Sequence, residues 1–221
     1  MKPLLLVSCL MSAMACSSLA FAQSPFDLSA PPVGKQAGTI MIRVRAIGVI
    51  PLDSSSSISV IGGHVNATAQ AAPEADFSYF FTDNIAVELI AATTRHNVSA
   101  SNTAIGHVDV GSVWVLPPTL TLQYHFFPHE RFSPYVGAGI NATFFYGAHA
   151  AGPPVTDVTF SNNVGAAIQA GIDYNIGGHW FANADVKQIF LNTTASIDGG
   201  AIKAHTALNP LVVGMGIGYR F

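Results

Sequence analysis

The sequence predicts an all-β protein, an eight-stranded antiparallel transmembrane β-barrel of the outer-membrane type. Half of the 221 residues are apolar and only 10% are charged, whereas about a quarter of the residues of a soluble domain carry charge. After residue 22, no segment approaches the ~18 consecutive apolar residues that a membrane-spanning helix needs. Apolar residues instead alternate with small or polar ones along eight segments. This pattern is typical of membrane strands, which need only about ten residues each.

Residues 1–22 are expected to form a signal peptide. Lys2 precedes the apolar run "LLLVSCLMSAMA", and the tripeptide AFA (20–22) has the small-x-small pattern of a cleavage site. Both cysteines of the chain lie in this segment, so the mature chain is expected to contain no disulfide. A lipoprotein site at Cys16 is the competing interpretation, which is disfavoured because alanine stands where such sites usually carry leucine.

A flexible periplasmic segment, residues 23–38, is expected next because it is rich in proline and glycine and lacks periodicity. The transmembrane barrel is expected to follow over residues 39–221. Its first four predicted strands are residues 39–50, 74–81, 85–93 and 119–126. In the first, isoleucine and valine alternate with arginine, and in the second, three aromatic residues alternate with acidic residues and serine. In the third, aliphatic residues oppose Glu88, and in the fourth, leucine, tyrosine and phenylalanine alternate with threonine, glutamine and histidine.

The second half of the chain repeats this scheme. The remaining predicted strands are residues 134–146, 164–175, 180–191 and 211–221. The first two set aliphatic and aromatic residues against glycine, asparagine, glutamine and aspartate, and the third sets alanine, valine and phenylalanine against asparagine, aspartate and lysine. The last, "LVVGMGIGYRF", has a large apolar residue at every odd position and glycine or arginine at the even positions from 214 onward.

The connections between the predicted strands alternate in length. The short connections are residues 82–84, 127–133 and 176–180. The longer ones, expected to be loops rich in Ser, Gly, Asn and Ala, are residues 51–65, 99–113, 147–161 and 193–205. Short turns on one side and long loops on the other are typical of an outer-membrane barrel with both termini in the periplasm.

The charged residues decide which face of the strands meets lipid. All of the charges on the strand faces fall on the less apolar face, apart from Arg95 at the outer rim. A charge at the lipid midplane costs about 2–4 kcal/mol, so this segregation favours a lipid-facing apolar surface. A secreted lipocalin-like barrel would show the reverse, with abundant charge outside. The predicted lumen network consists of Arg43, Arg45, Asp76, Glu88, Asp173, Asp185, Lys187 and Arg220, and Glu74 lies on the same face.

The lumen is expected to be polar below and apolar above. Strand direction places the charged residues in the middle and periplasmic parts, where unpaired charges would each cost several kcal/mol and should therefore form a network. The predicted apolar pocket nearer the extracellular end consists of Ile47, Ile90, Ile189 and Leu191. An alternative interpretation is that the charges only fill and rigidify the barrel.

Two further features stand at opposite ends of the barrel. Pro117 and Pro118 remove two backbone donors, so the strand that they precede cannot pair normally there. They indicate either a strand end at the membrane rim or a lateral gap through which an apolar solute leaves the lumen. At the other end, Phe221 is expected at the periplasmic interface, where aromatic residues concentrate. A C-terminal aromatic is also the signal that the barrel-assembly machinery of Gram-negative bacteria generally recognises.

The sequence resembles the outer membrane protein W family. The matching stretches, in order, are "RVRAIGVIP" (43–51), "FTDNIAVELIAAT" (81–93), "LPPTLTLQYHF" (116–126), "PYVGAGIN" (134–141), "AGIDY" (170–174) and "GIGYRF" (216–221). One departure is Leu211, which stands after Pro210 where an aromatic often follows. The resemblance implies an eight-stranded barrel in the outer membrane, with a role in moving small hydrophobic molecules across it, and implies no enzyme activity.

The function predicted from these features is binding or conduction of small hydrophobic molecules. A structural or interaction barrel without transport is the alternative, and a lipid-modifying enzyme ranks third because only His96 with Ser99 or Ser101 suggests a catalytic pair. The histidines are scattered, so no metal site is expected, and no cofactor is indicated. The net charge of −3 without a basic patch argues against nucleic acid. The expected partners are outer-membrane lipid and lipopolysaccharide, the assembly machinery and the solutes themselves, while the oligomeric state stays open.

Overall fold

The computed structural model describes residues 34–52 and 55–221. The predicted signal peptide and the beginning of the segment 23–38 lie outside the described residues. Within the described residues, no helix is long and apolar enough to cross a membrane.

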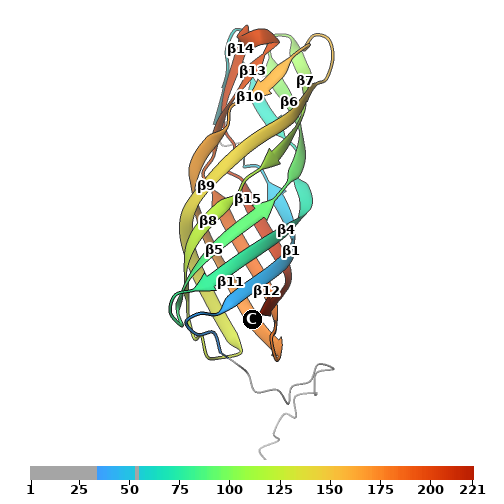
Figure 1. The fold of residues 1–221 in the computed structure, drawn as a ribbon. Coiled ribbons are helices and arrows are strands. Elements are labelled where there is room, and N and C mark those ends of the chain that lie inside the picture. The colour runs from blue at the N-terminus through green and yellow to red at the C-terminus, as the bar shows by residue number, and fades with distance from the viewer. Residues whose placement is uncertain (1–33, 53–54) are drawn as a thin grey trace, which may run out of the picture.

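Eight antiparallel strands close into a barrel (Figure 1). Each strand pairs with its neighbours along the chain, β15 pairs with β1, and the order runs β1, β4, β5, β8, β9, β11, β12, β15. The predicted fold class is therefore confirmed. The bounds of these strands are β1 (Ile40–Ile50), β4 (Gln70–Phe80), β5 (Ile85–Ala92), β8 (Thr119–His125), β9 (Phe132–Ala150), β11 (Asn163–Gly177), β12 (Trp180–Ile189) and β15 (Leu211–Arg220).

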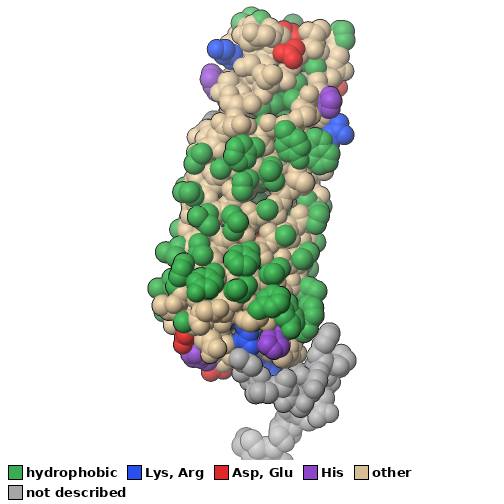
Figure 2. Space-filling model, viewed as in Figure 1, with side chains coloured by type: hydrophobic (Ala, Val, Ile, Leu, Met, Phe, Trp, Pro, Cys, Tyr) green, Lys and Arg blue, Asp and Glu red, His purple; other side chains and the backbone are tan. Residues whose placement is uncertain are grey.

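The two faces of the barrel wall differ as the alternation predicts. Large apolar side chains such as Val44, Leu122 and Met215 are exposed. On the face that Figure 2 shows, apolar side chains form a belt over the lower two thirds of the molecule. The inward face of the same strands carries the charged side chains, of which Arg43 and Glu88 are fully buried. Lipid therefore meets a hydrocarbon-like surface, and the charges are kept inside.

The inward glycines of β15 allow neighbouring strands to approach closely. A Cβ atom added to Gly216 would lie 2.0 Å from the carbonyl oxygen of Val44 and 2.7 Å from the Cα of Arg45. Gly216 is paired with Arg45 in the ladder between β15 and β1. The large side chain of Arg45 thus lies where its neighbour has none.

The segments predicted as long loops are largely strands, which corrects that prediction. They extend the wall beyond the apolar belt as two further groups of strands (Figure 1). These strands are β2 (Ser55–Ile58), β3 (His64–Ala67), β6 (Thr94–Thr103), β7 (Gly106–Leu116), β10 (Val158–Phe160), β13 (Asn192–Ile197) and β14 (Ile202–Ala207), with a 3₁₀ turn η1 (Asp198–Gly200) between the last two. Their many serine, threonine and asparagine residues resemble loop composition, yet inward residues such as Val98, Val108 and Ile197 alternate with them and form an apolar core.

Candidate functional site: an ion network beneath an apolar lumen

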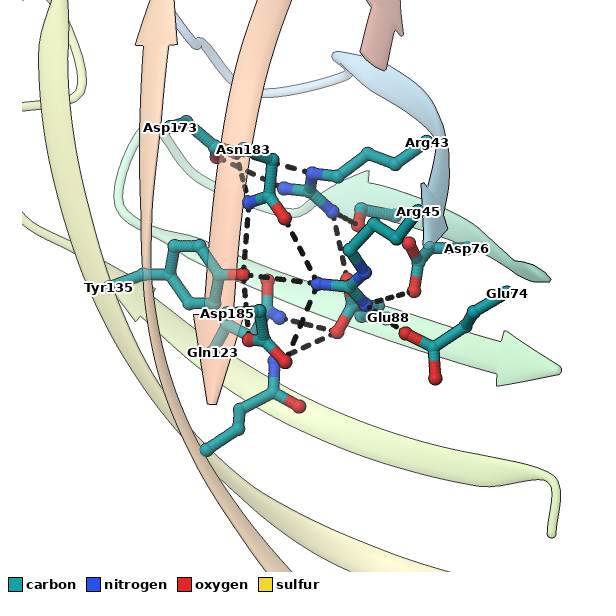
Figure 3. Close-up of polar contacts among 12 residues, drawn as sticks. Arg43, Arg45, Glu74, Asp76, Glu88, Gln123, Tyr135, Asp173, Asn183 and Asp185 are labelled. Atoms are coloured by element: carbon teal, nitrogen blue, oxygen red, sulfur yellow. Dashed lines mark hydrogen bonds and ion pairs between the residues drawn. The ribbon is translucent and has the colours of Figure 1, made fainter. Parts of the chain in front are cut away.

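The lower lumen contains a buried ion network centred on two arginines of β1 (Figure 3). Arg43 donates from Nη1 to Glu88 Oε1 at 2.8 Å and to Ser78 Oγ at 2.8 Å. Its Nη2 donates to Asp173 Oδ2 at 3.0 Å, and its Nε donates to Asp173 Oδ1 at 3.3 Å. One guanidinium therefore joins carboxylates from β5 and β11 across the lumen.

Arg45 binds the second group of carboxylates, which lies on β4 and β12. Its Nη2 forms an ion pair with Asp76 and lies 3.0 Å from Glu74 Oε1, and its Nη1 lies 3.5 Å from Asp185 Oδ1. The Cα pairing of Arg45 with Glu74, and of Arg43 with Asp76, follows from the register between β1 and β4. Adjacent strands thus bring opposite charges to the same height in the lumen.

Lys187 forms the upper edge of the network. Its Nζ lies 3.2 Å from Glu74 Oε2 and 3.9 Å from Asp185 Oδ1. Glu74 and Lys187 also line the cavity above, so this ion pair is the floor of the apolar region. Of the predicted network residues, seven are joined by these ion pairs: Arg43, Arg45, Asp76, Glu88, Asp173, Asp185 and Lys187.

The structure brings the eighth predicted residue, Arg220, to the periplasmic end of the lumen. Its Nη1 donates to the carbonyl of Gly34 at 2.7 Å, and its guanidinium lies 5.6 Å from the ring centre of Phe181. The terminal Phe221 is exposed beside it, with its backbone N–H bonded to Ile40 O at 2.9 Å and its ring 4.9 Å from that of Tyr219.

Lys35 is a network residue that the sequence analysis missed, because residues 23–38 were expected to be flexible. Its side chain is buried in the lumen, with Nζ 2.7 Å from Asp173 Oδ2 and 2.9 Å from both Ser133 Oγ and His125 Nδ1. Burial lowers the pKa of Lys35 to about 8, although the attraction of Asp173 opposes the shift. The predicted lumen set held four cations and five anions, and this imbalance is the signal that could have indicated a further cation.

Uncharged polar side chains complete the network, and they too were not singled out. Gln123 and Gln169 donate to Glu88 Oε2 at 2.7 and 2.8 Å. The Tyr135 hydroxyl donates to Asp185 Oδ2 at 2.9 Å, and Asn183 Nδ2 donates to Asp173 Oδ1 at 2.9 Å. All four residues occupy inward positions of their strands, so the alternation locates them even though their role is decided by contacts across the lumen.

An apolar cavity of about 80 Å³ lies above the network. Ile47, Ile189 and Leu191, three of the predicted pocket residues, are buried together and line it, and Phe145 lines it from β9. The fourth, Ile90, is buried on β5 outside the residues that line this cavity. The apolar core of the extension lies beyond the cavity, and Val98 belongs to both.

Pro117 and Pro118 lie between β7 and β8, and Pro117 lines the cavity. Toward β9 the chain stays attached, because Ala142 N–H donates to Pro118 O at 2.9 Å. Toward β5 and β6 the ladder is interrupted: it ends at the pair Ile90–Thr119 and resumes at Thr94–Val115. The prolines therefore coincide with an interruption of the backbone ladder toward β5 and β6, whereas a backbone bond bridges the same height toward β9.

The histidine chemistry considered from the sequence finds little geometric support. His96 points inward, where Nδ1 lies 2.7 Å from Thr68 O and Nε2 lies 2.8 Å from Thr94 Oγ1. The alternation of β6 places Ser99 and Ser101 on the opposite face. In residues 34–52 and 55–221, no three His, Cys, Asp or Glu side chains are placed to hold a metal ion.

Comparisons with known proteins agree with this geometry. A family model described as the OmpW family matches residues 36–221. The uncharacterized outer-membrane protein y4mB of Sinorhizobium fredii is 43% identical in an alignment of 221 positions that covers 95% of each chain. Outer membrane protein W of Escherichia coli K12 is 34% identical over 202 residues, covering 88% of this chain and 93% of that protein.

A solved structure of an outer-membrane protein is also similar to this chain. The crystal structure of the outer membrane protein OprG from Pseudomonas aeruginosa matches with a TM-score of 0.78 at 30% identity, covering 85% of this chain and 98% of that one. The closed barrel, the lipid-facing apolar belt and these relatives place the protein in the outer membrane. The chain belongs to the OmpW family of outer-membrane proteins.

Proposed function

We propose that the barrel takes up small apolar solutes at its extracellular end and releases them sideways into the membrane. The observation that carries this proposal is an apolar lumen that ends on a buried ion network. The core of the extension and the cavity around Ile47 and Leu191 give an apolar solute a favourable environment. Below it, the ion pair of Lys187 and Glu74 offers no such environment.

The ion network argues against passage straight through the barrel. Separating a buried charge from its partner costs about 3–5 kcal/mol. A solute that moved toward the periplasm would have to separate Lys187 from Glu74 and then Arg43 from Asp173 and Glu88. An apolar solute supplies no interaction that compensates this cost, so an exit above the network is favoured.

The interrupted ladder at Pro117 and Pro118 supports an exit at that height. Residues 91–93 face residues 116–118 across the interruption, where Thr93 Oγ1 bonds to Val115 O at 3.3 Å in place of a backbone ladder. A single side-chain bond at an exposed position separates at lower cost than several ladder bonds. The cavity is small, so Phe145 and Leu191 would have to change rotamer as a solute passes.

The first experiment measures entry of labelled naphthalene into cells with an intact outer membrane. Strains that make the folded barrel are compared with strains that lack it, and faster entry with the barrel is expected. Leu191→Trp fills the cavity and should reduce entry to the level without the barrel. Val164→Trp, at an exposed position on the lipid face of β11, is the matched control and should leave entry unchanged.

The exit is tested separately with Pro117→Val combined with Pro118→Thr, which restores two backbone donors. Loss of naphthalene entry at equal levels of folded barrel would support lateral release, and unchanged entry would contradict it. Equal entry with and without the wild-type barrel would contradict transport itself and favour a structural or interaction role. Lipid, lipopolysaccharide and the assembly machinery are the other partners that we propose, the last through Phe221.

A further inference from the structure

A polar groove of about 660 Å³ lies on the outside of the extension, across β3, β6, β7 and β9. Two backbone irregularities lie along it. Gly111 has a φ of 148°, and the register between β7 and β9 shifts between Ser112 and Trp114. Hydrogen-bonding side chains, one cation and one carboxylate line the groove, among them Asn66, Arg95, Asn97, Ser99, Asp109 and Ser112.

The groove begins where the apolar belt ends. Arg95 pairs with Trp114, and Trp114 pairs with Tyr146, so the three residues form one row across β6, β7 and β9. The two aromatic rings stack with centroids 6.3 Å apart. Aromatic residues of this kind mark the membrane interface of barrels. Figure 2 also shows a Lys or Arg side chain and a His side chain just above the apolar belt, on the right.

The positive and negative side chains of the groove lie toward opposite ends. Arg95, at the membrane end, is exposed, and its guanidinium is oriented by a 2.9 Å bond to Ser112 Oγ. Asp109 lies toward the other end, opposite Ser99 in the ladder and 3.1 Å from His107. Four residues of strand separate Arg95 from Ser99, about 13 Å at the usual rise of a strand. An anion at Arg95 would therefore stay clear of Asp109.

We infer that this groove binds the phosphorylated sugar headgroup of an outer-leaflet glycolipid such as lipid A. The phosphate meets the Arg95 guanidinium, whose planar fork matches phosphate geometry. The sugar hydroxyls meet Asn66, Asn97 and Ser99 above it, and the acyl chains descend along the apolar belt. A free sugar phosphate shares the headgroup chemistry but lacks the acyl chains, so the belt below the groove favours the lipid.

The test uses the chain's two tryptophans, Trp114 on β7 and Trp180 at the beginning of β12. Trp180→Phe leaves Trp114, beside Arg95, as the reporter of binding. Bisphosphorylated lipid A is titrated into the folded protein in detergent, with lipid A stripped of phosphate and soluble glucosamine 1-phosphate as separate arms. Folding of every variant is verified by its resistance to unfolding in unheated SDS.

We expect a saturable change in Trp114 fluorescence with intact lipid A and about tenfold weaker binding after Arg95→Gln, which removes one charge-assisted contact. Arg131→Gln, at the periplasmic turn before β9, removes the same charge at the opposite end and should leave binding unchanged. Equal affinity of wild type and Arg95→Gln, or equal affinity for dephosphorylated lipid A, would overturn the inference. Equal binding of glucosamine 1-phosphate would assign the groove to a soluble sugar phosphate instead. Because the readout is independent of solute entry, this inference and the transport proposal can fail separately.

Discussion

At the scale of single residues, the arginines of β1 show how a buried charge is tolerated. Arg43 is fully buried, yet each of its guanidinium nitrogens donates to an acceptor on another strand. The carboxylates of Glu88 and Asp173 depend on it in turn. The ion pairs of Arg43 thus add little net stability, but without Arg43 the carboxylates of Glu88 and Asp173 would be buried with fewer partners.

Arg43→Met should therefore lower the free energy of unfolding by about 3–5 kcal/mol, because it leaves two carboxylates with one partner fewer in the lumen. Urea unfolding of the barrel in lipid vesicles measures the change. Arg131→Met removes a cation from the half-buried periplasmic turn and should change the free energy by less than about 0.5 kcal/mol. Equal effects of the two substitutions would contradict a buried network at Arg43.

Lys35 gives a prediction of pH dependence. Its pKa is about 8 in the folded protein, against 10.5 for the unfolded side chain, so between these values the unfolded state binds more protons. Stability then rises with pH across this window, because losing the proton removes the cost of burying the charge. The difference in unfolding free energy between wild type and Lys35→Met, measured from pH 7 to 11, should show this rise. A difference that is flat or falls with pH would contradict it.

At the scale of elements, the inward glycines of β15 allow the backbone of β1 to approach closely. β15 needs glycine where β1 places its arginines, and at Gly216 the neighbouring backbone leaves no room for a methyl group. Gly48 on β1 is different, since the nearest atom to an added Cβ is the flexible Val213 Cγ2 at 3.7 Å.

Gly216→Ala should destabilise the barrel by about 1–3 kcal/mol because the backbone of β1 must move to admit the methyl group. Gly48→Ala, a matched substitution in the adjacent strand, should be neutral or slightly stabilising because alanine restricts the unfolded chain. The measurement is again urea unfolding in vesicles. The prediction fails if the two variants have the same stability.

At the scale of the whole molecule, strand pairing is continuous around the barrel and is interrupted in the extension. The barrel closes through paired strands, whereas in the extension β2 contacts β3, and β10 contacts β9, without ladder pairing between them in the described strands. The interruption at Pro117 and Pro118 lies at the boundary between these parts. The extension is therefore expected to open without opening the barrel.

Amide hydrogen exchange tests this separation. The amides of β2, β3 and β10 should exchange at least tenfold faster than those paired between β1 and β15, because fewer ladder bonds must break for local opening. Mass spectrometry after peptic digestion resolves these segments. Equal protection of the extension and the barrel would show that they open as one unit and would weaken the case for lateral release.

The sequence by itself determined the barrel, its eight membrane strands and its lipid-facing surface. The side-chain alternation of a strand is local and has a period of two, so charge on one phase and bulk on the other can be read directly from segments such as 119–126. The same alternation predicted which charges enter the lumen. The alternation also explains why residues 99–113 were wrongly expected to be a loop. Their serine and asparagine residues face outward, while their valines belong to an apolar core.

Only the tertiary structure decided which inward groups meet. Arg43 contacts Asp173 across 130 positions of sequence, and Lys35 enters the same site from a segment that has no periodicity. The choice of partners depends on strand register and on the stagger of strands around the closed barrel, which no single segment encodes. The cavity, the interruption of the ladder at the prolines and the groove at Arg95 have the same origin, since each is formed by strands that meet only when the barrel closes.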